Sequence, residues 1–270
     1  MPPDSNSSDW SSNPEAPLRV RGLSVDYGSG PVLDGIDLGL PSGRLIAVVG
    51  PNGAGKSSFL RAALGFTPAQ TGANVTFFGR PLAEVRRRVA YMPQRESVDW
   101  EFPASVSDVV LMGLYGQLGL LRRVRSSHRA AAMDALERVG MQEFAGRQIG
   151  ELSGGQQKRV FLARTLVQGA DLFLMDEPFA GVDAVSESII ARELAALRDA
   201  GSTVLVVHHD LAAVRRSFDD CVLLNRQVWA TGSVGEVLTA EHVASAYGGI
   251  VPIALIEMDR ARGKDTDSPS

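Results

Sequence analysis

Two segments near the start of the chain alternate apolar and polar residues. The first runs from Leu18 to Tyr27 (LRVRGLSVDY) and the second from Val32 to Leu40 (VLDGIDLGL). Such alternation is typical of strands that are buried on one face only. The intervening residues 28–31 (GSGP) have the composition of a turn. We therefore predict two neighbouring antiparallel strands in this region.

Three later runs are continuously apolar, which is typical of strands buried on both faces. They are Leu45–Val49 (LIAVV), Leu172–Met175 (LFLM) and Thr203–Val207 (TVLVV). Segments with helical composition follow or separate them, at residues 57–64, 156–168 and 186–200. Strands that alternate with helices in this way predict a parallel sheet covered by helices on both sides.

The stretch from about residue 95 to residue 150 has a helical pattern instead. Within it, segments 107–113 and 127–140 stand out, the second with apolar positions at spacings of three and four. We predict an α/β fold whose core, residues 17–94 and 161–258, includes an N-terminal antiparallel β subdomain. An all-helical subdomain is inserted at residues 95–160. The polar ends, residues 1–16 and 259–270, are expected to be disordered.

Composition narrows the class of protein. Of the 270 residues, 44% are hydrophobic and 21% are charged, which argues against a wholly disordered chain. The net charge of −4 argues against nucleic acid as the main partner, and the one cysteine, Cys221, excludes an intramolecular disulfide framework. We expect an intracellular protein. The apolar stretch at residues 109–121 is shorter than the ~18 residues of a membrane span, and the N-terminus lacks the apolar core of a secretion signal.

A glycine-rich segment directly after the first buried run carries the strongest chemical signal. Residues 50–57 (GPNGAGKS) fit the pattern G-x-x-x-x-G-K-[ST]. In such a loop, successive backbone N–H groups converge on phosphate oxygens, and the following helix adds the positive end of its dipole. We expect Lys56 to neutralise nucleotide phosphates and the Ser57 hydroxyl to bind Mg²⁺. The predicted nucleotide-binding residues here are Gly50, Pro51, Asn52, Gly53, Ala54, Gly55, Lys56, Ser57 and Ser58.

Two carboxylates, Asp176 and Glu177, follow the second buried run. The carboxyl ends of parallel strands face the ligand crevice of an open α/β sheet, so we expect both side chains beside the loop that carries Lys56. One carboxylate, Asp176 in our assignment, can bind Mg²⁺, and Glu177 can orient the attacking water. The alternative interpretation is an acidic pair that merely ends a strand.

Together with Leu152–Gln156 (LSGGQ), these motifs resemble those of the ATP-binding cassette ATPases and keep that family's order. The resemblance covers about residues 18–240, and LSGGQ is its most specific element. It implies a RecA-like P-loop core that binds ATP and Mg²⁺, with Glu177 as the catalytic carboxylate. It further implies that Tyr27 stacks on adenine, that Gln94 contacts Mg²⁺ and water, and that Asp183 lies in a loop crossing a dimer interface. The residues implied to close on the γ-phosphate held by the opposite subunit are Ser153, Gly154, Gly155 and Gln156.

His209 matches the histidine that bonds the γ-phosphate in this family, but His208 precedes it and the sequence barely separates the two. His209 is preferred because the family's histidine directly precedes the aspartate that caps the next helix. Tyr27 could instead be an ordinary strand aromatic. Lys158 and Arg159, which follow the LSGGQ signature, are expected to face solvent or the dimer interface rather than to perform chemistry.

The signature precedes a helix that is predicted to begin near Gln156, so the chain carries a second anion-binding helix N-terminus. Two subunits arranged head to tail would let each signature complete the other's phosphate loop, giving a symmetric dimer, with identical chains expected, and two ATP molecules. The segments at residues 93–103 (PQRESVDWEFP), 107–113, 179–183 and 207–210 resemble the manganese, zinc and iron branch of metal importers. That resemblance implies a cytoplasmic ATPase attached to the inner face of the membrane through a polytopic permease, with an extracytoplasmic metal-binding protein as an indirect partner.

The string VDWEFP resembles the manganese or iron members of this branch more than the zinc-only members, and manganese is the cargo that we expect, followed by zinc or iron. We expect no residue of this chain to contact the transported metal, because Asp99, Glu101 and the histidine pair lack the spacing of a ligand set. Mg²⁺ with ATP is therefore the one metal predicted. The apolar residues of segments 98–103 and 109–121 either dock a helix of the permease or pack inside the helical insertion.

Three other functions stay open. One is transport of another cargo, such as an iron-siderophore. Another is a soluble cassette ATPase of DNA repair or translation, against which the single cassette, the missing heptads and the negative charge argue. The third is a non-catalytic clamp, against which Glu177 and His209 argue.

Overall fold

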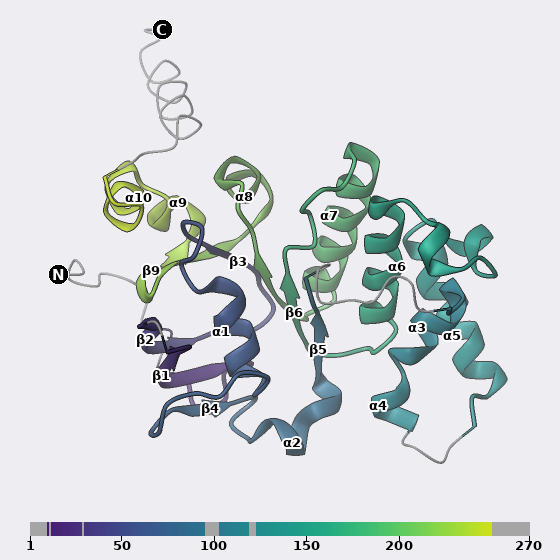
Figure 1. The fold of residues 1–270 in the computed structure, drawn as a ribbon, viewed down its shortest axis with the longest axis horizontal. Helices are drawn as coiled ribbons and strands as arrows, with labels where there is room; N and C mark the ends of the chain where they lie inside the picture. Colours follow the sequence, from purple (N-terminus) through teal and green to yellow (C-terminus); the bar gives the residue numbers. More distant parts are fainter. Residues whose placement is uncertain (1–9, 11, 29, 95–102, 119–122, 250–270) are drawn as a thin grey trace, which may run out of the picture. The chain divides into compact units, whose positions relative to one another are not determined.

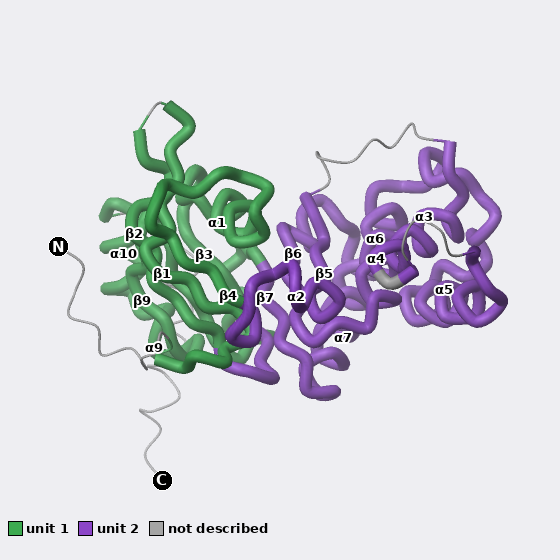
Figure 2. The backbone as a smooth tube through the Cα atoms, turned by 90° about the horizontal axis from the view of Figure 1, so that it is seen from below, with its two compact units in different colours: residues 1–40, 46–76, 207–270 green, residues 41–45, 77–206 purple. Residues whose placement is uncertain are grey.

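The chain divides into two compact units in the computed structural model, which describes residues 10, 12–28, 30–94, 103–118 and 123–249 (Figure 2). Unit 1 comprises residues 1–40, 46–76 and 207–270, and unit 2 comprises residues 41–45 and 77–206. The predicted boundaries at residues 94 and 161 do not coincide with this division. Strand β5 (Val89–Met92) packs on helix α6 (Gly154–Leu166), so the helical segment shares a unit with strands. Most of the two ends predicted to be disordered lie outside the described residues.

The first strands of unit 1 form the antiparallel sheet predicted from their alternation. β1 (Arg19–Asp26) pairs with β2 (Pro31–Gly39) on one side and with β4 (Asn74–Thr76) on the other. The register of β1 against β2 shifts between Val20 and Leu23, so both side chains stay buried although they are three residues apart. The three-residue strand β4 was not predicted, because it is too short to show a period.

The second group of strands in unit 1 carries the phosphate loop. All five residues of β3 (Leu45–Val49) are buried, as its apolar run predicts. β3 runs parallel to β8 (Asp220–Asn225), which forms an unpredicted antiparallel hairpin with β9 (Gln227–Ser233). The helices of this unit are α1 (Lys56–Ala63), α8 (Leu211–Ser217), α9 (Val234–Val237) and α10 (Ala240–Ala246).

Unit 2 contains the second set of parallel strands. β5, β6 (Leu172–Asp176) and β7 (Thr203–Val207) are neighbours in that order. β5 and β6 are parallel, with Met92 opposite Met175, so both strands end at the same edge. The residues that follow these two strands are therefore brought together.

Helices make up the rest of unit 2. α3 (Val106–Met112), α5 (Ser126–Arg138) and α6 pack on one another, and α7 (Ala184–Asp199) packs on α6 (Figure 1). The shorter elements are α2 (Leu82–Val85), η1 (Arg86–Arg88), α4 (Tyr115–Leu118), η3 (Gln142–Phe144) and η4 (Ile149–Glu151). Within the described residues, no helix is both long and apolar enough to cross a membrane.

The segment expected to dock a permease is partly within the described residues. In the stretch 109–121, the side chains of Val109, Val110, Leu111, Leu114 and Leu118 are buried. They therefore pack in the helical core, which was the second of the two interpretations offered for this stretch. Residues 95–102 lie outside the described residues.

Candidate nucleotide-binding and hydrolysis site

The predicted phosphate loop connects β3 to α1. The Lys56 Nζ donates hydrogen bonds of 2.9 Å to the carbonyl oxygens of Gly50 and Pro51. Lys56 is only 7% exposed, so its ammonium group is held within the curl of its own loop. Gly55, which precedes α1, has a φ of 92°, a conformation that favours glycine. The loop thus presents its lysine and the N-terminus of α1 together, as phosphate binding requires.

The β8–β9 hairpin braces this loop, a contact that the sequence did not indicate. A Cβ atom on Gly50 would overlap the carbonyl oxygen of Leu224 at the end of β8. The Ala54 carbonyl accepts a hydrogen bond of 3.0 Å from the N–H of Arg226, between β8 and β9. Both ends of the loop are therefore fixed by the same hairpin, and glycine is the residue that permits the close approach.

Tyr27 lies beside the helix that follows the phosphate loop. Its side chain is 57% exposed, and its hydroxyl is 3.3 Å from the Ser58 Oγ in α1. An exposed aromatic ring in this place can stack on a nucleotide base, which is the role that the family resemblance implies.

The two adjacent histidines differ sharply in environment. His208 is buried, and its Nδ1 accepts a 3.0 Å hydrogen bond from the Asp210 N–H. Burial, and secondarily the neighbouring His209, lower the pKa of His208 to about 4, so its ring is neutral at physiological pH. His209 is exposed, and Asp210 caps α8 by accepting from the N–H groups of Ala212 and Ala213 at 2.8 and 3.1 Å. Of the two histidines, His209 is therefore the one whose side chain is accessible at the surface of the chain.

In unit 2, Gln94 and Glu177 meet at the edge where β5 and β6 end. The Gln94 Nε2 donates a 3.2 Å hydrogen bond to the Glu177 Oε2. Asp176, the last residue of β6, is 2% exposed. Parallel pairing of the two strands thus brings together two of the predicted catalytic residues, which are 83 positions apart in the chain.

Glu177 has an unusual backbone conformation. Its φ is 52°, in the left-handed region that residues other than glycine rarely adopt. Holding a non-glycine residue there costs on the order of 1–3 kcal/mol, and such residues cluster at functional sites. The Glu177 carbonyl accepts a 2.8 Å hydrogen bond from the Lys158 Nζ.

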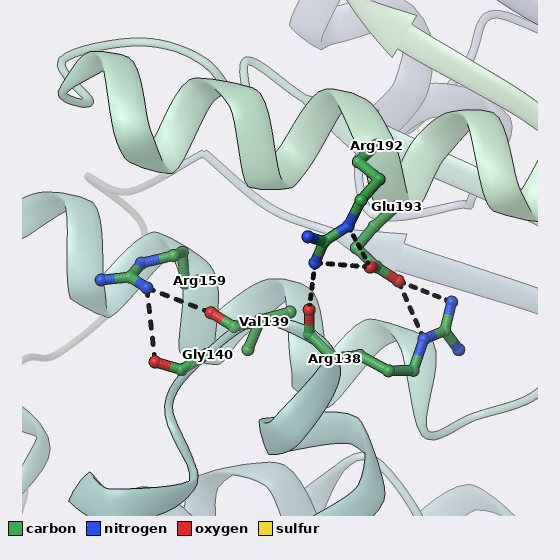
Figure 3. Close-up of polar contacts among 6 residues, drawn as sticks. All are labelled: Arg138, Val139, Gly140, Arg159, Arg192 and Glu193. Carbon is green, nitrogen blue, oxygen red and sulfur yellow. Dashed lines mark hydrogen bonds and ion pairs between the residues drawn. The ribbon is translucent and has the colours of Figure 1, made fainter.

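The expectation that Lys158 faces solvent or a dimer interface is therefore wrong, because its side chain is 5% exposed and points to Glu177. The acceptor is a backbone carbonyl that only the tertiary structure delivers, so the sequence held no signal for this contact. Arg159, the next residue, is half-buried and donates to the carbonyls of Val139 and Gly140 at the end of α5 (Figure 3).

The LSGGQ signature forms the start of α6. The Ser153 Oγ accepts from the Gln156 N–H at 3.3 Å, and the Gln156 Oε1 accepts from the Ser153 N–H at 2.9 Å, which is a capping box. This box starts the helix at Gly154, two residues before the predicted start near Gln156. The N–H groups of Gly154 and Gly155 lie in the first turn, where the helix dipole favours an anion.

Asp183 caps α7 and lies against the signature. Its carboxylate accepts from the Ser186 N–H at 2.9 Å and the Ser186 hydroxyl at 2.8 Å, and these two donors lower the pKa of Asp183. A Cβ atom on Gly155 would overlap the Asp183 carboxylate and the Ser186 hydroxyl. The second glycine of the signature therefore permits direct contact between the starts of α6 and α7.

The described part of the chain offers no group of three or more His, Cys, Asp or Glu side chains that could hold a metal ion. His208 and His209 lie within this part, whereas Asp99 and Glu101 lie outside the described residues.

Comparison with known proteins identifies the family. The sequence pattern of the ABC transporter family matches residues 33–180. The zinc transport system ATP-binding protein TroB of Treponema pallidum is 52% identical over 238 residues, 88% of this chain and 89% of TroB. The manganese transport system ATP-binding protein MntB of Bacillus subtilis is 48% identical over 233 residues, 86% of this chain and 93% of MntB.

A solved structure shares the fold. The crystal structure of a nucleotide-free ATP-binding cassette from an ABC transporter superposes with a TM-score of 0.73 and 25% sequence identity, over 87% of this chain and 99% of that chain. This similarity supports the predicted α/β ATPase fold. Because the family pattern spans more than half of the chain and both relatives align over most of it, this chain belongs to the ABC transporter family as an ATPase subunit.

Proposed function

We propose that this ATPase subunit powers the import of a divalent transition metal, manganese first and then zinc or iron. The hydrogen bond between Gln94 and Glu177 carries the hydrolytic part of the proposal. Two relatives that are named for zinc and manganese transport support the metal part. The preference for manganese is based on the resemblance of residues 98–103 (VDWEFP).

Hydrolysis requires a base for the attacking water, compensation of the phosphate charge and a hydrogen-bond donor to the γ-phosphate. In this proposal the Glu177 carboxylate accepts a proton from the water that attacks the γ-phosphorus, and the bond to the bridging β–γ oxygen breaks. Lys56 and the N–H groups of the phosphate loop compensate the negative charge, and His209 donates to the γ-phosphate. Tyr27 stacks on the base and positions the nucleotide.

The oxygen donors of the proposed site suit Mg²⁺. This ion prefers oxygen ligands, usually takes only a few of them from protein, and fills the rest with water and phosphate oxygens. The residues that would hold it are Ser57 through its hydroxyl, Gln94 through its amide oxygen and Asp176 through a carboxylate that is 2% exposed. When bound, the ion compensates charge on the phosphate oxygens.

The proposed assembly contains two copies of the chain and a membrane permease. Ser153, Gly154, Gly155 and Gln156 of one copy would close on the ATP held by the phosphate loop of the other, with Asp183 at the boundary between the copies. The permease would attach this dimer to the cytoplasmic face of the membrane, and an extracytoplasmic protein would deliver the metal. The cargo would then never touch this chain.

Metal uptake in living cells tests this proposal. The native chain is replaced in its own cells by the Glu177→Gln variant, and uptake of labelled Mn²⁺, Zn²⁺ and Fe²⁺ is measured in parallel. We expect Mn²⁺ uptake to fall to the background of cells that lack the chain. In the purified Glu177→Gln protein, phosphate release should fall to background while ATP binding is retained.

Glu143→Gln is the matched control, because this carboxylate is exposed in η3 and is not among the proposed site residues. It should leave uptake and phosphate release unchanged. Unchanged uptake of all three metals in the Glu177→Gln cells would overturn the metal cargo. Normal phosphate release from that variant would overturn the hydrolytic assignment.

A further inference from the structure

Lys158 is a buried cation at the back of the proposed hydrolytic centre. It lies in the second turn of α6, two residues after Gln156 of the signature. Its side chain is 5% exposed, and its Nζ is 2.8 Å from the Glu177 carbonyl oxygen. Both residues belong to unit 2.

A lysine in this position needs an explanation beyond packing. Removing an ammonium group from water is costly, and an apolar side chain of similar length would fill the same space without that cost. One compensation for this cost is the charge-assisted hydrogen bond to the Glu177 carbonyl, and such bonds are shorter and stronger than neutral ones. The bond is made to one particular backbone carbonyl, so what it secures is the conformation of Glu177.

Glutamate residues rarely adopt the backbone conformation that Glu177 has here. The φ of Glu177 is 52°, and it is the residue at which the chain leaves β6. In this conformation its carboxylate meets the Gln94 amide at 3.2 Å while its carbonyl points to Lys158. Rotation of the backbone toward the common right-handed or extended regions would move the carboxylate and the carbonyl together. A donor that fixes the carbonyl therefore also fixes the carboxylate.

We propose that Lys158 is a positioning residue for ATP hydrolysis, which holds Glu177 in the left-handed conformation that aims its carboxylate at the attacking water. This inference depends on the proposed role of Glu177. Helix α6, which begins with the signature, would then also position Glu177 of the same chain. In this proposal Lys158 acts through Glu177 and not on the nucleotide itself.

The experiment compares Lys158→Met with the native full-length chain. Methionine keeps the length and apolar contacts of the side chain but cannot donate a hydrogen bond. We expect kcat for ATP to fall by about tenfold to a hundredfold, as is typical when a catalytic group is misplaced by about 1 Å. The KM for ATP should stay within about twofold, because a residue that only positions Glu177 contributes to the transition state and not to the binding of ATP. Lys158→Arg retains a charged donor and should keep a higher kcat than Lys158→Met.

Thr165→Val is the matched control on the same helix. Thr165 is also buried, but its hydroxyl donates to the Phe161 carbonyl, which belongs to α6 itself and not to Glu177. This variant should keep the native kcat and KM. If Lys158→Met does not fold, Lys158→Arg decides the question through the same split between kcat and KM.

Comparison of Lys158→Met with Glu177→Gln separates this inference from the proposed function. Full turnover in Glu177→Gln would overturn the proposed function. Loss of turnover in Glu177→Gln combined with a native kcat in Lys158→Met would overturn the inference alone. A parallel rise in KM and loss of thermal stability in Lys158→Met, without a change in kcat, would assign Lys158 a structural role only.

Discussion

His208 and His209 illustrate how far the roles of adjacent residues of one type can diverge. The sequence places them side by side, yet His208 is buried with its Nδ1 bonded to the Asp210 N–H, and His209 is exposed. The bond at His208 requires a neutral acceptor nitrogen. Protonation of His208 would therefore break a hydrogen bond at the start of α8. The stability of the fold should depend on pH for this reason.

The stability of the chain should depend on pH through His208. Its pKa is about 4 in the folded chain and about 6.5 in the unfolded chain, because burial disfavours the charged ring. Below pH 6.5 the unfolded chain binds a proton that the folded chain does not, so stability is complete above that pH and is lost as pH falls toward 4. The loss should reach about 3 kcal/mol.

Urea unfolding between pH 7 and pH 4.5 measures this contribution as the difference between the native chain and His208→Asn. The asparagine amide oxygen can accept the Asp210 N–H but does not titrate, so the variant should lose less stability on acidification. His209→Asn removes only the secondary cause of the lowered pKa and leaves His208 buried, so it should lose more stability on acidification than His208→Asn does. Equal slopes for the native chain and His208→Asn would contradict the assignment.

Helices α5, α6 and α7 are joined by a polar cluster at the end of α5. The Glu193 carboxylate in α7 is 5% exposed and accepts from the Arg138 guanidinium, with distances of 2.7 and 2.8 Å (Figure 3). Arg192 pairs with the same carboxylate at 3.1 Å and donates to the Arg138 carbonyl at 2.7 Å. The cluster fixes α5 against the helix that Asp183 begins.

Removing one charged side chain from this cluster should lower the free energy of unfolding more than removing an oppositely charged pair. In Arg138→Met a largely buried carboxylate loses a partner, so the free energy of unfolding should fall by about 2 kcal/mol. The double variant Arg138→Met/Glu193→Met removes the buried charge as well and should be more stable than the single variant. Arg198→Met serves as the control, because its partner Asp199 is exposed, and it should change stability by less than about 0.5 kcal/mol. Chemical unfolding of the native chain and the three variants measures these free energies. A double variant that is less stable than Arg138→Met would contradict the expectation.

The elements that could be predicted from the sequence are those whose signal is local. Continuous apolar runs located β3 and β7 to the residue, and alternation located both ends of β1 and of β2 to within one residue. The hairpin of β8 and β9 was missed although it braces the phosphate loop. Its second strand, β9 (Gln227–Ser233), mixes apolar and polar residues, and its extended conformation depends mainly on pairing with β8. Such strands carry little period of their own.

The site residues follow the same division. Lys56 and the signature are set by short motifs, because adjacent backbone groups build a phosphate cradle or a helix start. Lys158 could not be predicted, because its partner is a carbonyl 19 positions away that faces it only after β6 and α6 have packed. The family resemblance favoured His209 over His208, whereas the burial of His208, which depends on the packing of the whole unit, had no local signal in the sequence.

At the scale of the whole assembly, the family resemblance predicts that each ATP is bound by a phosphate loop from one copy and a signature from the other. Two variants separate this arrangement from a site made by one chain. Lys56→Ala removes the loop cation. Ser153→Asp keeps the cap of α6, since aspartate caps as well as serine, but it adds a charge that repels the γ-phosphate. At about 4 Å and an effective dielectric constant of about 20, that repulsion is about 4 kcal/mol.

Mixed dimers of differently tagged chains give opposite outcomes for the two arrangements. A Lys56→Ala chain paired with a Ser153→Asp chain contains one intact loop and one intact signature, on different chains. If the sites form between copies, one of the two sites is intact, and phosphate release should rise well above that of either parent dimer, to at most about half of the native rate. A native chain paired with a chain that carries both substitutions should be inactive, because each site then contains one defective part. Recovery in this second pair but not in the first would mean that each chain completes its own site, and the head-to-tail dimer would have to be abandoned.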